Sequence, residues 1–311
     1  MENIIEIKNL KKYFKDVKAV DDISFSVKKG SLFAFLGLNG AGKSTTINMI
    51  CGSLQKDAGE IFIDGKNAYE NVFETKKALG VVFQSSALDK VLTVKENLEI
   101  KAALYGICGE AFKTRLAELS KLLELDSILN RTFSKLSGGQ KRRVDIARAI
   151  IHKPKILILD EPTTGLDPQT RKMVWNVINS LRKTDNITVF LTTHYMEEAA
   201  DADYVVILDN GKISAEGTPI ELKNRYTGDF ITLYGADEKQ VKKLKKDYEI
   251  LPDAIRIAVE NTAEATELIL KHPDVFKDYE ITKGKMDDVF LSATGKKIYQ
   301  GDNQWKLYGF W

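Results

Sequence analysis

Apolar positions near the start of the chain follow the patterns of β-strands. Ile4–Ile7 and Asp22–Val27 alternate apolar and polar residues, which is typical of strands that bury one face. Leu32–Leu36 is apolar throughout, so it predicts a strand buried on both faces. A glycine-rich stretch follows it and leads into a predicted helix over about residues 43–51. Gly59–Asp64 alternates again and predicts a further strand.

The period of the pattern becomes helical between about residues 88 and 152. Leu98, Ala102 and Tyr105 recur at helical spacing, as do several of the leucines that follow. Beyond this helical block, short apolar runs alternate with helical stretches, which is the rhythm of a parallel sheet with crossover helices. The predicted strands there are Lys155–Asp160, Ile187–Thr192 and Tyr204–Leu208, and the predicted helices are Arg171–Arg182 and Met196–Ala202.

The pattern restarts beyond about Lys223, after a hairpin signal at Asn210-Gly211. We therefore divide the chain into a large α/β domain over residues 1–222 and a small C-terminal α+β domain over residues 223–311. In the small domain the predicted strands are Phe230–Tyr234, Ile255–Val259 and Tyr279–Ile281, and the predicted helices are Val241–Lys246, Ala263–Leu270 and Met286–Ala293.

Composition and charge argue against several classes of protein. Among 311 residues, 46 Lys and Arg stand against 44 Asp and Glu, and the net charge of +2 gives no basis for binding nucleic acid or an anionic membrane through bulk charge. Cys51 and Cys108 form no CxxC pair, which predicts unpaired thiols in a reducing compartment. No apolar run approaches the roughly 20 residues of a spanning helix, and Met1–Leu10 lacks a signal-peptide pattern. Any membrane role is therefore expected to come through a partner.

The glycine-rich stretch fits the phosphate-binding pattern G-x-x-x-x-G-K-[ST], with a buried strand before it and a helix after it. A triphosphate is dense in negative charge, and backbone N–H groups at a helix N-terminus hold it together with a lysine. We expect Lys43 to contact the outer phosphates and the Ser44 hydroxyl to bind Mg²⁺. A chance glycine-rich turn is the alternative, which both flanking elements disfavour. The loop consists of Gly37, Leu38, Asn39, Gly40, Ala41, Gly42, Lys43 and Ser44.

Two carboxylates, Asp160 and Glu161, follow the apolar run Ile156–Leu159. The carboxyl ends of parallel strands are where an open α/β sheet binds its ligands. We expect Asp160 to orient Mg²⁺ and Glu161 to act as the general base that polarises the attacking water in phosphoryl transfer. Taken alone, the pair also fits a simple turn at a strand end, but the accompanying phosphate loop favours the catalytic interpretation.

The segment Leu136–Gln140 reads LSGGQ, opens a predicted helix, and precedes the strand that ends in the acidic pair. In this order the motifs closely resemble the ATP-binding cassette (ABC) family, whose signature is LSGGQ, over about residues 4–222. The resemblance implies an α/β fold of the P-loop NTPase (RecA-like) type. Its parallel sheet core is expected to carry an antiparallel β subdomain and an inserted helical subdomain over about residues 88–152.

The resemblance also gives roles to single residues that would otherwise be taken for packing or surface positions. Gln84 looks like the Q-loop glutamine, which is counted with the catalytic and metal-binding residues. Asp167 looks like the D-loop aspartate, and His194 looks like the switch histidine that contacts the γ-phosphate. Phe14 falls where the family places the aromatic that stacks on adenine, and its neighbour Tyr13 stays open for the same role.

The family implies that each ATP is bound between two chains. Ser137, Gly138 and Gly139, with Gln140 beside them, form a second anion site at a helix N-terminus, which cannot reach the phosphates held by its own chain. A head-to-tail dimer with a second copy, or with a close paralogue, is therefore implied. In it each ATP lies between one chain's phosphate loop, Thr45 included, and the other chain's signature.

Softer motifs resemble one branch of the family, the ABC-2 type exporters of the daunorubicin-resistance group. They are Ala87–Asp89 with Leu92–Val94 and Glu96–Leu98, then His194–Ala199, and Met286–Leu291 with Thr294-Gly295. This branch implies export of a drug, antibiotic or lipid-like molecule by a separate membrane permease, with the present chain on the cytoplasmic side of the membrane. The short, partly apolar segment Ser85–Val91 is the expected docking surface for that permease.

Three alternatives stay open at this point: an importer subunit, a soluble ABC ATPase of DNA repair or translation, and a regulatory ABC protein that binds ATP without cycling. The single set of motifs and the short helical block without sustained heptads argue against the soluble ATPase, and intact Glu161 and His194 argue against the regulatory protein. The late pattern Val289–Gly295 favours the exporter over an importer. Aromatic residues crowd the C-terminus and serve either a dimer or permease contact or the packing of a tail. They are Trp305, Tyr308, Phe310 and Trp311.

Overall fold

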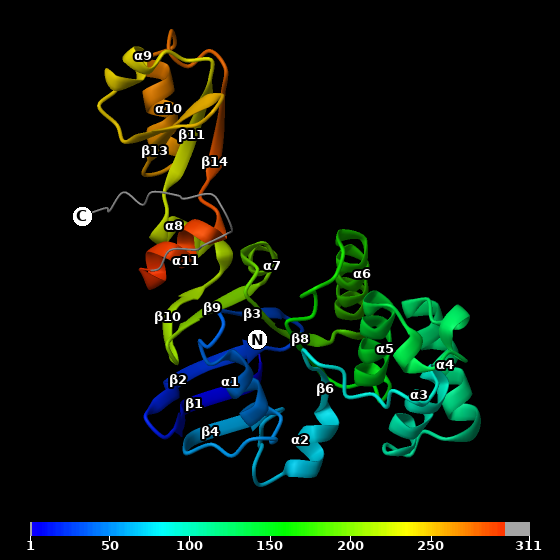
Figure 1. The fold of residues 1–311 in the computed structure, drawn as a ribbon. Coiled ribbons are helices and arrows are strands. Elements are labelled where there is room, and N and C mark those ends of the chain that lie inside the picture. The colour runs from blue at the N-terminus through cyan, green and yellow to red at the C-terminus, as the bar shows by residue number, and fades with distance from the viewer. Residues whose placement is uncertain (1, 296–311) are drawn as a thin grey trace. The chain divides into compact units, whose positions relative to one another are not determined.

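The computed structural model describes residues 2–295 of the chain, whose elements are shown in Figure 1. The chain divides into two compact units, one ending at Ile213 and the other beginning at Ser214. This division falls inside strand β10 (Lys212–Gly217), earlier than the boundary that we predicted after residue 222. The predicted boundary instead lies within a helix, α8 (Pro219–Tyr226), because a Thr218–Glu221 capping box starts a helix there.

Six of the described strands form one sheet in the order β10-β9-β3-β8-β7-β6. Strands β3 (Leu32–Leu36), β7 (Ile156–Asp160) and β8 (Thr188–Thr193) are buried over their whole length, which the apolar run of β3 predicts for that strand. β3 pairs in parallel with β8 and β9 (Tyr204–Asp209), and β7 pairs in parallel with β8 and β6 (Leu79–Val82). The carboxyl ends of these strands therefore share one edge of the sheet.

A second sheet is antiparallel and has the order β2-β1-β4-β5. β1 and β2 are longer than predicted, because shifts of register carry the pairing past the polar positions where the alternation ends. The ring of Phe25 lies 5.3 Å from that of Phe33 and 5.2 Å from that of Phe35, which joins the two sheets in one core. The strands are β1 (Asn3–Phe14), β2 (Val17–Lys28), β4 (Ala58–Ile63) and β5 (Lys66–Asn67).

The predicted helical block contains helices α3 (Val94–Ala103), α4 (Gly109–Leu123) and α5 (Gly138–Ile150), which contact one another (Figure 1). Helix α1 (Lys43–Ile50) lies in the core between the sheets, where Ile47 is fully buried. Helix α2 (Val72–Ala78) was not predicted. Helices α6 (Pro168–Asp185) and α7 (Met196–Ala200) complete this unit.

The C-terminal unit has the predicted α+β character, with a four-stranded antiparallel sheet in the order β12-β13-β11-β14. The predicted helix Val241–Lys246 is wrong in its bounds, because Asp237 caps a helix that starts at Glu238 and ends at Lys242. The elements are β11 (Asp229–Tyr234), α9 (Glu238–Lys242), β12 (Tyr248–Ile250), β13 (Ala254–Val259), α10 (Thr262–Lys271), β14 (Tyr279–Lys283) and α11 (Met286–Thr294).

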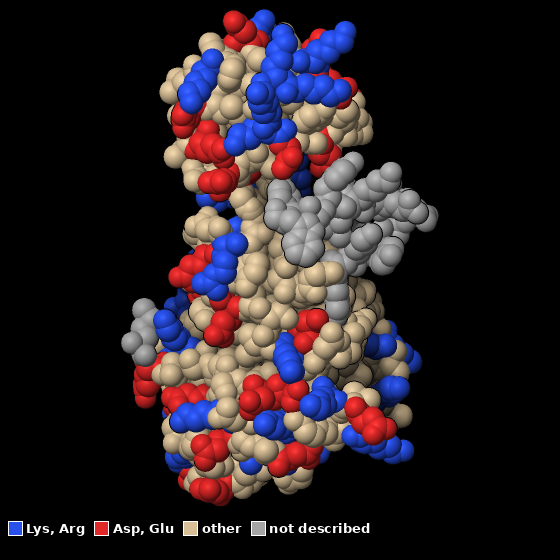
Figure 2. Space-filling model, turned by 90° about the vertical axis from the view of Figure 1, so that its left-hand side faces the viewer, with Lys and Arg blue, Asp and Glu red and all other residues tan. Residues whose placement is uncertain are grey.

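Lys and Arg side chains are interspersed with Asp and Glu side chains over the face shown in Figure 2, in keeping with the near-balanced composition. Within residues 2–295, no helix combines the length and the apolar character needed to cross a membrane. The predicted aromatic tail, Trp305 to Trp311, lies outside the described residues.

Candidate functional site

The phosphate loop joins β3 to α1 and needs glycine at specific positions. Gly40 and Gly42 have φ angles of 83° and 109°, in the left-handed region that favours glycine. A Cβ at Gly42 would stand 2.3 Å from the carbonyl oxygen of Ala19, so a larger residue does not fit. The N–H groups in the first turn of α1 have no acceptor within the helix, because helix geometry provides none. This end of the loop therefore fits an anion.

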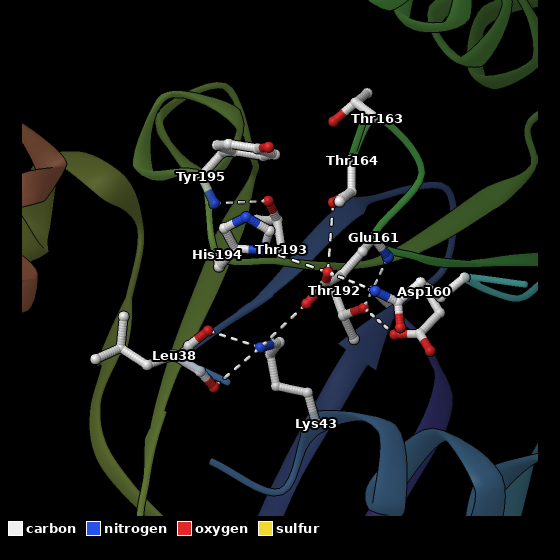
Figure 3. Close-up of polar contacts among 12 residues, drawn as sticks. Leu38, Lys43, Asp160, Glu161, Thr163, Thr164, Thr192, Thr193, His194 and Tyr195 are labelled. Carbon is white, nitrogen blue, oxygen red and sulfur yellow. Dashed lines mark hydrogen bonds and ion pairs between the residues drawn. The ribbon is translucent and has the colours of Figure 1, made fainter. Parts of the chain in front are cut away.

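Lys43 is a buried cation in this loop, with 4% of its side chain exposed. Its Nζ donates hydrogen bonds to the carbonyl oxygens of Gly37 and Leu38 at 2.7 and 3.1 Å, and lies 3.5 Å from Oε1 of Glu161 (Figure 3). Burial lowers the pKa of Lys43, and the negative charges of Glu161 and Asp160 oppose that effect. A phosphate beside Nζ would supply further negative charge, so the setting of Lys43 fits a nucleotide.

A cleft of about 660 Å³ opens beside the loop, within the size range of small-molecule and cofactor sites. The structure brings a large part of the predicted site to its walls. Those residues are Asn39, Gly40, Gly42, Lys43, Ser44, Thr45, Gln84 and Glu161. The cleft is also lined by residues that no motif indicated: Asp16, Val17, Lys18, Ala19 and Asn210.

Glu161 is the point at which the predicted catalytic side chains converge (Figure 3). Its Oε2 accepts hydrogen bonds from Gln84 Nε2 at 3.4 Å and from Thr164 Oγ1 at 3.3 Å. The same oxygen lies 3.3 Å from Nδ1 of His194, without hydrogen-bond geometry. Glu161 has a φ of 47°, an uncommon backbone conformation for a residue with a side chain. Groups from the phosphate loop and from the ends of β6, β7 and β8 thus meet at one buried carboxylate.

The residues predicted for Mg²⁺ are oxygen donors on neighbouring segments. Ser44 and Gln84 line the cleft, whereas Asp160 lies outside its lining and accepts a hydrogen bond from Thr192 Oγ1 at 2.5 Å (Figure 3). Among the described residues, no group of three or more His, Cys, Asp or Glu side chains could hold a metal alone. Mg²⁺ is usually bound through one or two carboxylates, water and substrate phosphates, and Asp160 is the one carboxylate in the predicted set.

Arg142 of α5 holds the loops after β6 and β7, and sequence reasoning missed it. Its buried guanidinium donates to the carbonyl oxygens of Pro162 at 2.6 Å, Phe83 at 2.7 Å and Glu161 at 2.9 Å, with a longer bond of 3.3 Å to Asp160. Burial lowers the pKa of Arg142, and the negative charges of Asp145 and Asp160 oppose this lowering. Because its partners are backbone carbonyls from distant segments, no sequence pattern marks this role.

The signature residues lie at the N-terminus of α5 and outside the lining of the cleft. Ser137 caps the helix, since its Oγ accepts a hydrogen bond from the N–H of Gln140 at 3.3 Å. A Cβ at Gly139 would stand 2.8 Å from the side chain of Thr170, whereas Gly138 faces open space. Asp167 caps α6 through the N–H of Thr170 at 2.9 Å, and it also lies outside the lining.

The aromatic residues considered for adenine lie at the end of β1. Phe14 is 46% exposed, and its register partner Val17 lines the cleft, although Phe14 itself does not. The hydroxyl of Tyr13 donates a hydrogen bond to the Asp21 carboxylate at 2.6 Å. The ring of Phe14 carries no polar group, so stacking would cost it no such bond.

The fold and cleft define a P-loop nucleotide hydrolase, and comparison with known proteins gives the family. The family model described as ABC transporter matches residues 20–164. Nod factor export ATP-binding protein I of Burkholderia orbicola (strain AU 1054) is 35% identical over 300 residues, covering 94% of this chain and 98% of that protein. Linearmycin resistance ATP-binding protein LnrL of Bacillus subtilis (strain 168) is 33% identical over 310 residues, covering 95% and 99%.

Solved structures agree with these relatives. The dimeric structure of MJ0796, a bacterial ABC transporter cassette, has a TM-score of 0.63 and 30% identity, covering 69% of this chain and 98% of that chain. The same cassette in a post-hydrolysis state, bound to ADP and Pi, has a TM-score of 0.64 and 28% identity over the same shares. The chain therefore belongs to the ABC transporter family. It is an ATP-binding cassette with ATPase activity, and cassettes of this family act as dimers with membrane subunits.

Proposed function

We propose that this chain is the ATP-hydrolysing subunit of an ABC-2 type exporter and works in a head-to-tail dimer with two ATP molecules between the chains. One observation carries the proposal: Glu161 and the phosphate loop share one cleft, while the signature residues lie outside its walls. The relatives named for Nod factor export and linearmycin resistance support export of a drug, antibiotic or lipid-like molecule.

Nucleotide binding is assigned to the loop and the residues after it. Backbone N–H groups of residues 39–45 would surround the β- and γ-phosphates, and Lys43 would neutralise them. The carbonyl oxygens of Gly37 and Leu38 hold Nζ in place through the bonds described above. Phe14, exposed beside the cleft, would stack on adenine.

Hydrolysis is assigned to the cluster around Glu161. Its carboxylate would accept a hydrogen bond from the attacking water and draw off the proton as the water oxygen bonds to the γ-phosphorus. The bond from that phosphorus to the bridging oxygen breaks, so that ADP leaves with its electron pair. His194 turns Nδ1 toward Glu161, which leaves Nε2 free to donate to the γ-phosphate. Mg²⁺ bound with the nucleotide, held by Ser44, Gln84 and Asp160, would neutralise charge on the phosphate oxygens.

The catalytic assignment is tested by Glu161→Gln, which keeps the shape of the side chain and removes its basicity. Steady-state ATP hydrolysis is expected to fall by at least about 100-fold, the usual contribution of a general base. An ATP-held dimer is expected to accumulate, which size-exclusion chromatography with ATP would detect. Lys43→Ala is expected to weaken nucleotide binding instead. Undiminished turnover by Glu161→Gln would refute the assignment.

The composite dimer is tested by mixing two inactive chains. Lys43→Ala removes the phosphate-binding lysine of the loop, and Ser137→Arg places a bulky side chain in the signature. If each ATP lies between chains, a mixed dimer contains one doubly spoiled site and one intact site, so partial activity returns. Absence of rescue, with mixed dimers demonstrated by cross-linking, would show that each chain builds its own site.

A second cleft, of about 210 Å³, supports the permease partner. It is lined by Lys76 of α2, by Lys101 and Tyr105, and by Arg148 of α5, and its lining within the described residues holds no Asp or Glu. Apolar side chains flank these positions in the sequence, including Phe73, which is 79% exposed. A basic cleft lined by elements that carry exposed apolar side chains suits a permease helix that presents an acidic residue. The predicted docking segment Ser85–Val91 is proposed as a further part of this surface.

The partner is tested by charge reversal at the second cleft. Lys101→Glu is expected to reduce co-purification with the permease from detergent, and Lys113→Glu, on an exposed face of α4, is the matched control. Equal recovery of the permease with both variants would contradict the assignment. Transport in inverted membrane vesicles separates the exporter from the importer alternative, since only an exporter accumulates substrate inside them.

A further inference from the structure

Glu198 of α7 is a buried carboxylate that no motif assigns to catalysis. Its side chain is buried, and its residue is 5% exposed. Oε1 accepts a hydrogen bond from the hydroxyl of Thr163, and Oε2 accepts one from the hydroxyl of Thr193 at 2.6 Å. Within residues 2–295 this carboxylate forms no ion pair, so these two hydroxyls compensate for its burial.

The two threonines belong to the segments that carry the proposed catalytic pair. Thr163 lies two residues beyond Glu161, in the loop after β7, and Thr193 directly precedes His194 at the end of β8. Figure 3 shows these side chains around one site. The Thr193 hydroxyl also accepts a hydrogen bond from the N–H of Tyr195 at 2.9 Å, which fixes the turn that follows. Both threonines are fully buried.

We infer that Glu198 is a positioning residue for ATP hydrolysis, because its carboxylate ties the segment of Glu161 to the segment of His194. Each oxygen holds one segment, so the spacing of the two segments is set by a rigid planar group. The contact that it sets is the 3.3 Å distance between Glu161 Oε2 and His194 Nδ1. This inference rests on the proposed catalytic role of Glu161.

Glutamine at position 198 would preserve the size of the side chain but break the double acceptor. Its amide has one oxygen, and its N–H₂ group would face a threonine hydroxyl that has to turn from donor to acceptor. At Thr193 one of the two acceptor lone pairs of the hydroxyl is already used by the N–H of Tyr195, and at either threonine a charge-assisted bond would become a weaker neutral one. One segment would therefore be held less tightly, and a displacement of about 1 Å near reacting groups costs up to about 100-fold in rate.

The test compares Glu198→Gln with Glu197→Gln, an exposed glutamate on the same helix, and with Glu161→Gln as the catalytic reference. For Glu198→Gln we expect kcat to fall by about 10- to 100-fold, while KM for ATP and nucleotide stoichiometry stay within about twofold. Glu197→Gln is expected to match the unsubstituted chain. Thr193→Ser and Thr163→Ser keep the hydroxyl and should retain kcat, whereas the corresponding Val variants should lose it as Glu198→Gln does.

Coupling between the groups separates positioning from general support of the fold. If Glu198 acts through Thr163, adding Thr163→Val to Glu198→Gln lowers kcat little further, because both remove one interaction. Loss of bound nucleotide in proportion to kcat would overturn the inference, since it indicates a smaller folded fraction. Full kcat in Glu198→Gln would also overturn it. If Glu161→Gln itself kept full turnover, the proposed function would fail first, which distinguishes the two failures.

Discussion

Replacing Arg142 with Ala tests whether the signature helix holds the catalytic loops. The guanidinium makes three short hydrogen bonds, at 2.6, 2.7 and 2.9 Å, to the carbonyl oxygens of Pro162, Phe83 and Glu161. Hydrogen bonds to a charged group contribute about 1.5–3 kcal/mol each, so their simple sum would be about 4.5–9 kcal/mol. Burial opposes the charged guanidinium, as its lowered pKa indicates, so the net loss has to be smaller than that sum.

We therefore expect Arg142→Ala to lower the free energy of unfolding by about 3–5 kcal/mol, because three buried carbonyl oxygens lose their donor at about 1–3 kcal/mol each and the burial of the guanidinium offsets part of that sum. For a domain of this size, one kcal/mol corresponds to about 2–4 °C in Tm, so Tm should fall by about 10 °C. Hydrolysis should fall as well, since the released loops carry Gln84 and Glu161. Differential scanning calorimetry measures Tm, and ATPase assays well below the new Tm measure turnover.

Lys141→Ala is the matched control for Arg142→Ala. Lys141 is the preceding residue of α5, and its Nζ lies 5.9 Å from the ring centre of Phe133, a contact that contributes at most about 1 kcal/mol. Arg142→Lys keeps the charge but not the planar fork of donors, so an intermediate Tm is expected. A Tm for Arg142→Ala equal to that of Lys141→Ala would refute the reasoning.

Further outcomes follow from single contacts. Burial lowers the pKa of His152 from 6.5 to about 4, so the unfolded chain takes up a proton first as pH falls. Between pH 6.5 and pH 4 the free energy of unfolding of the unsubstituted chain should therefore fall by about 1–2 kcal/mol, after allowance for partial exposure of His152. Denaturant titrations at both pH values should show a smaller fall for His152→Phe. Gly42→Ala should abolish nucleotide binding in calorimetry, because its Cβ would meet the carbonyl oxygen of Ala19 at 2.3 Å. Phe14→Ala should raise KM for ATP several-fold and Tyr13→Ala should not; the reverse order would assign adenine stacking to Tyr13.

The sequence predicted the central strands well because their burial leaves a continuous apolar run. β3 matches the predicted Leu32–Leu36, and β7 and β8 differ by one residue at their ends. Elements that depend on capping were harder to predict. α8 starts at a Thr218–Glu221 capping box, a pattern that is present in the sequence but from which we predicted no helix. β12 has only three residues and depends on pairing with β13 rather than on its own pattern.

In the candidate site, too, some residues could be predicted from the sequence and others could not. The motif residues could be found, and Lys43, Gln84 and Glu161 do meet around one cleft. The residues that hold them could not be found, because Arg142 bonds to carbonyl oxygens and Glu198 bonds to threonine hydroxyls from other segments. Such partners carry no sequence pattern, since any residue supplies a carbonyl oxygen and threonine is common in strands.

These supporting contacts connect the signature to the catalytic carboxylate within one chain. Helix α5 begins at the signature with Ser137 as its cap, and Arg142 lies in its second turn. In the proposed function the same helix would present its N-terminus to an anion, and it holds the carbonyl oxygens of Phe83 and Glu161 from its side. Glu161 also has an uncommon left-handed backbone that needs outside support. Because a helix is stiff over two turns, a displacement at the signature is expected to reach Glu161 through one side chain.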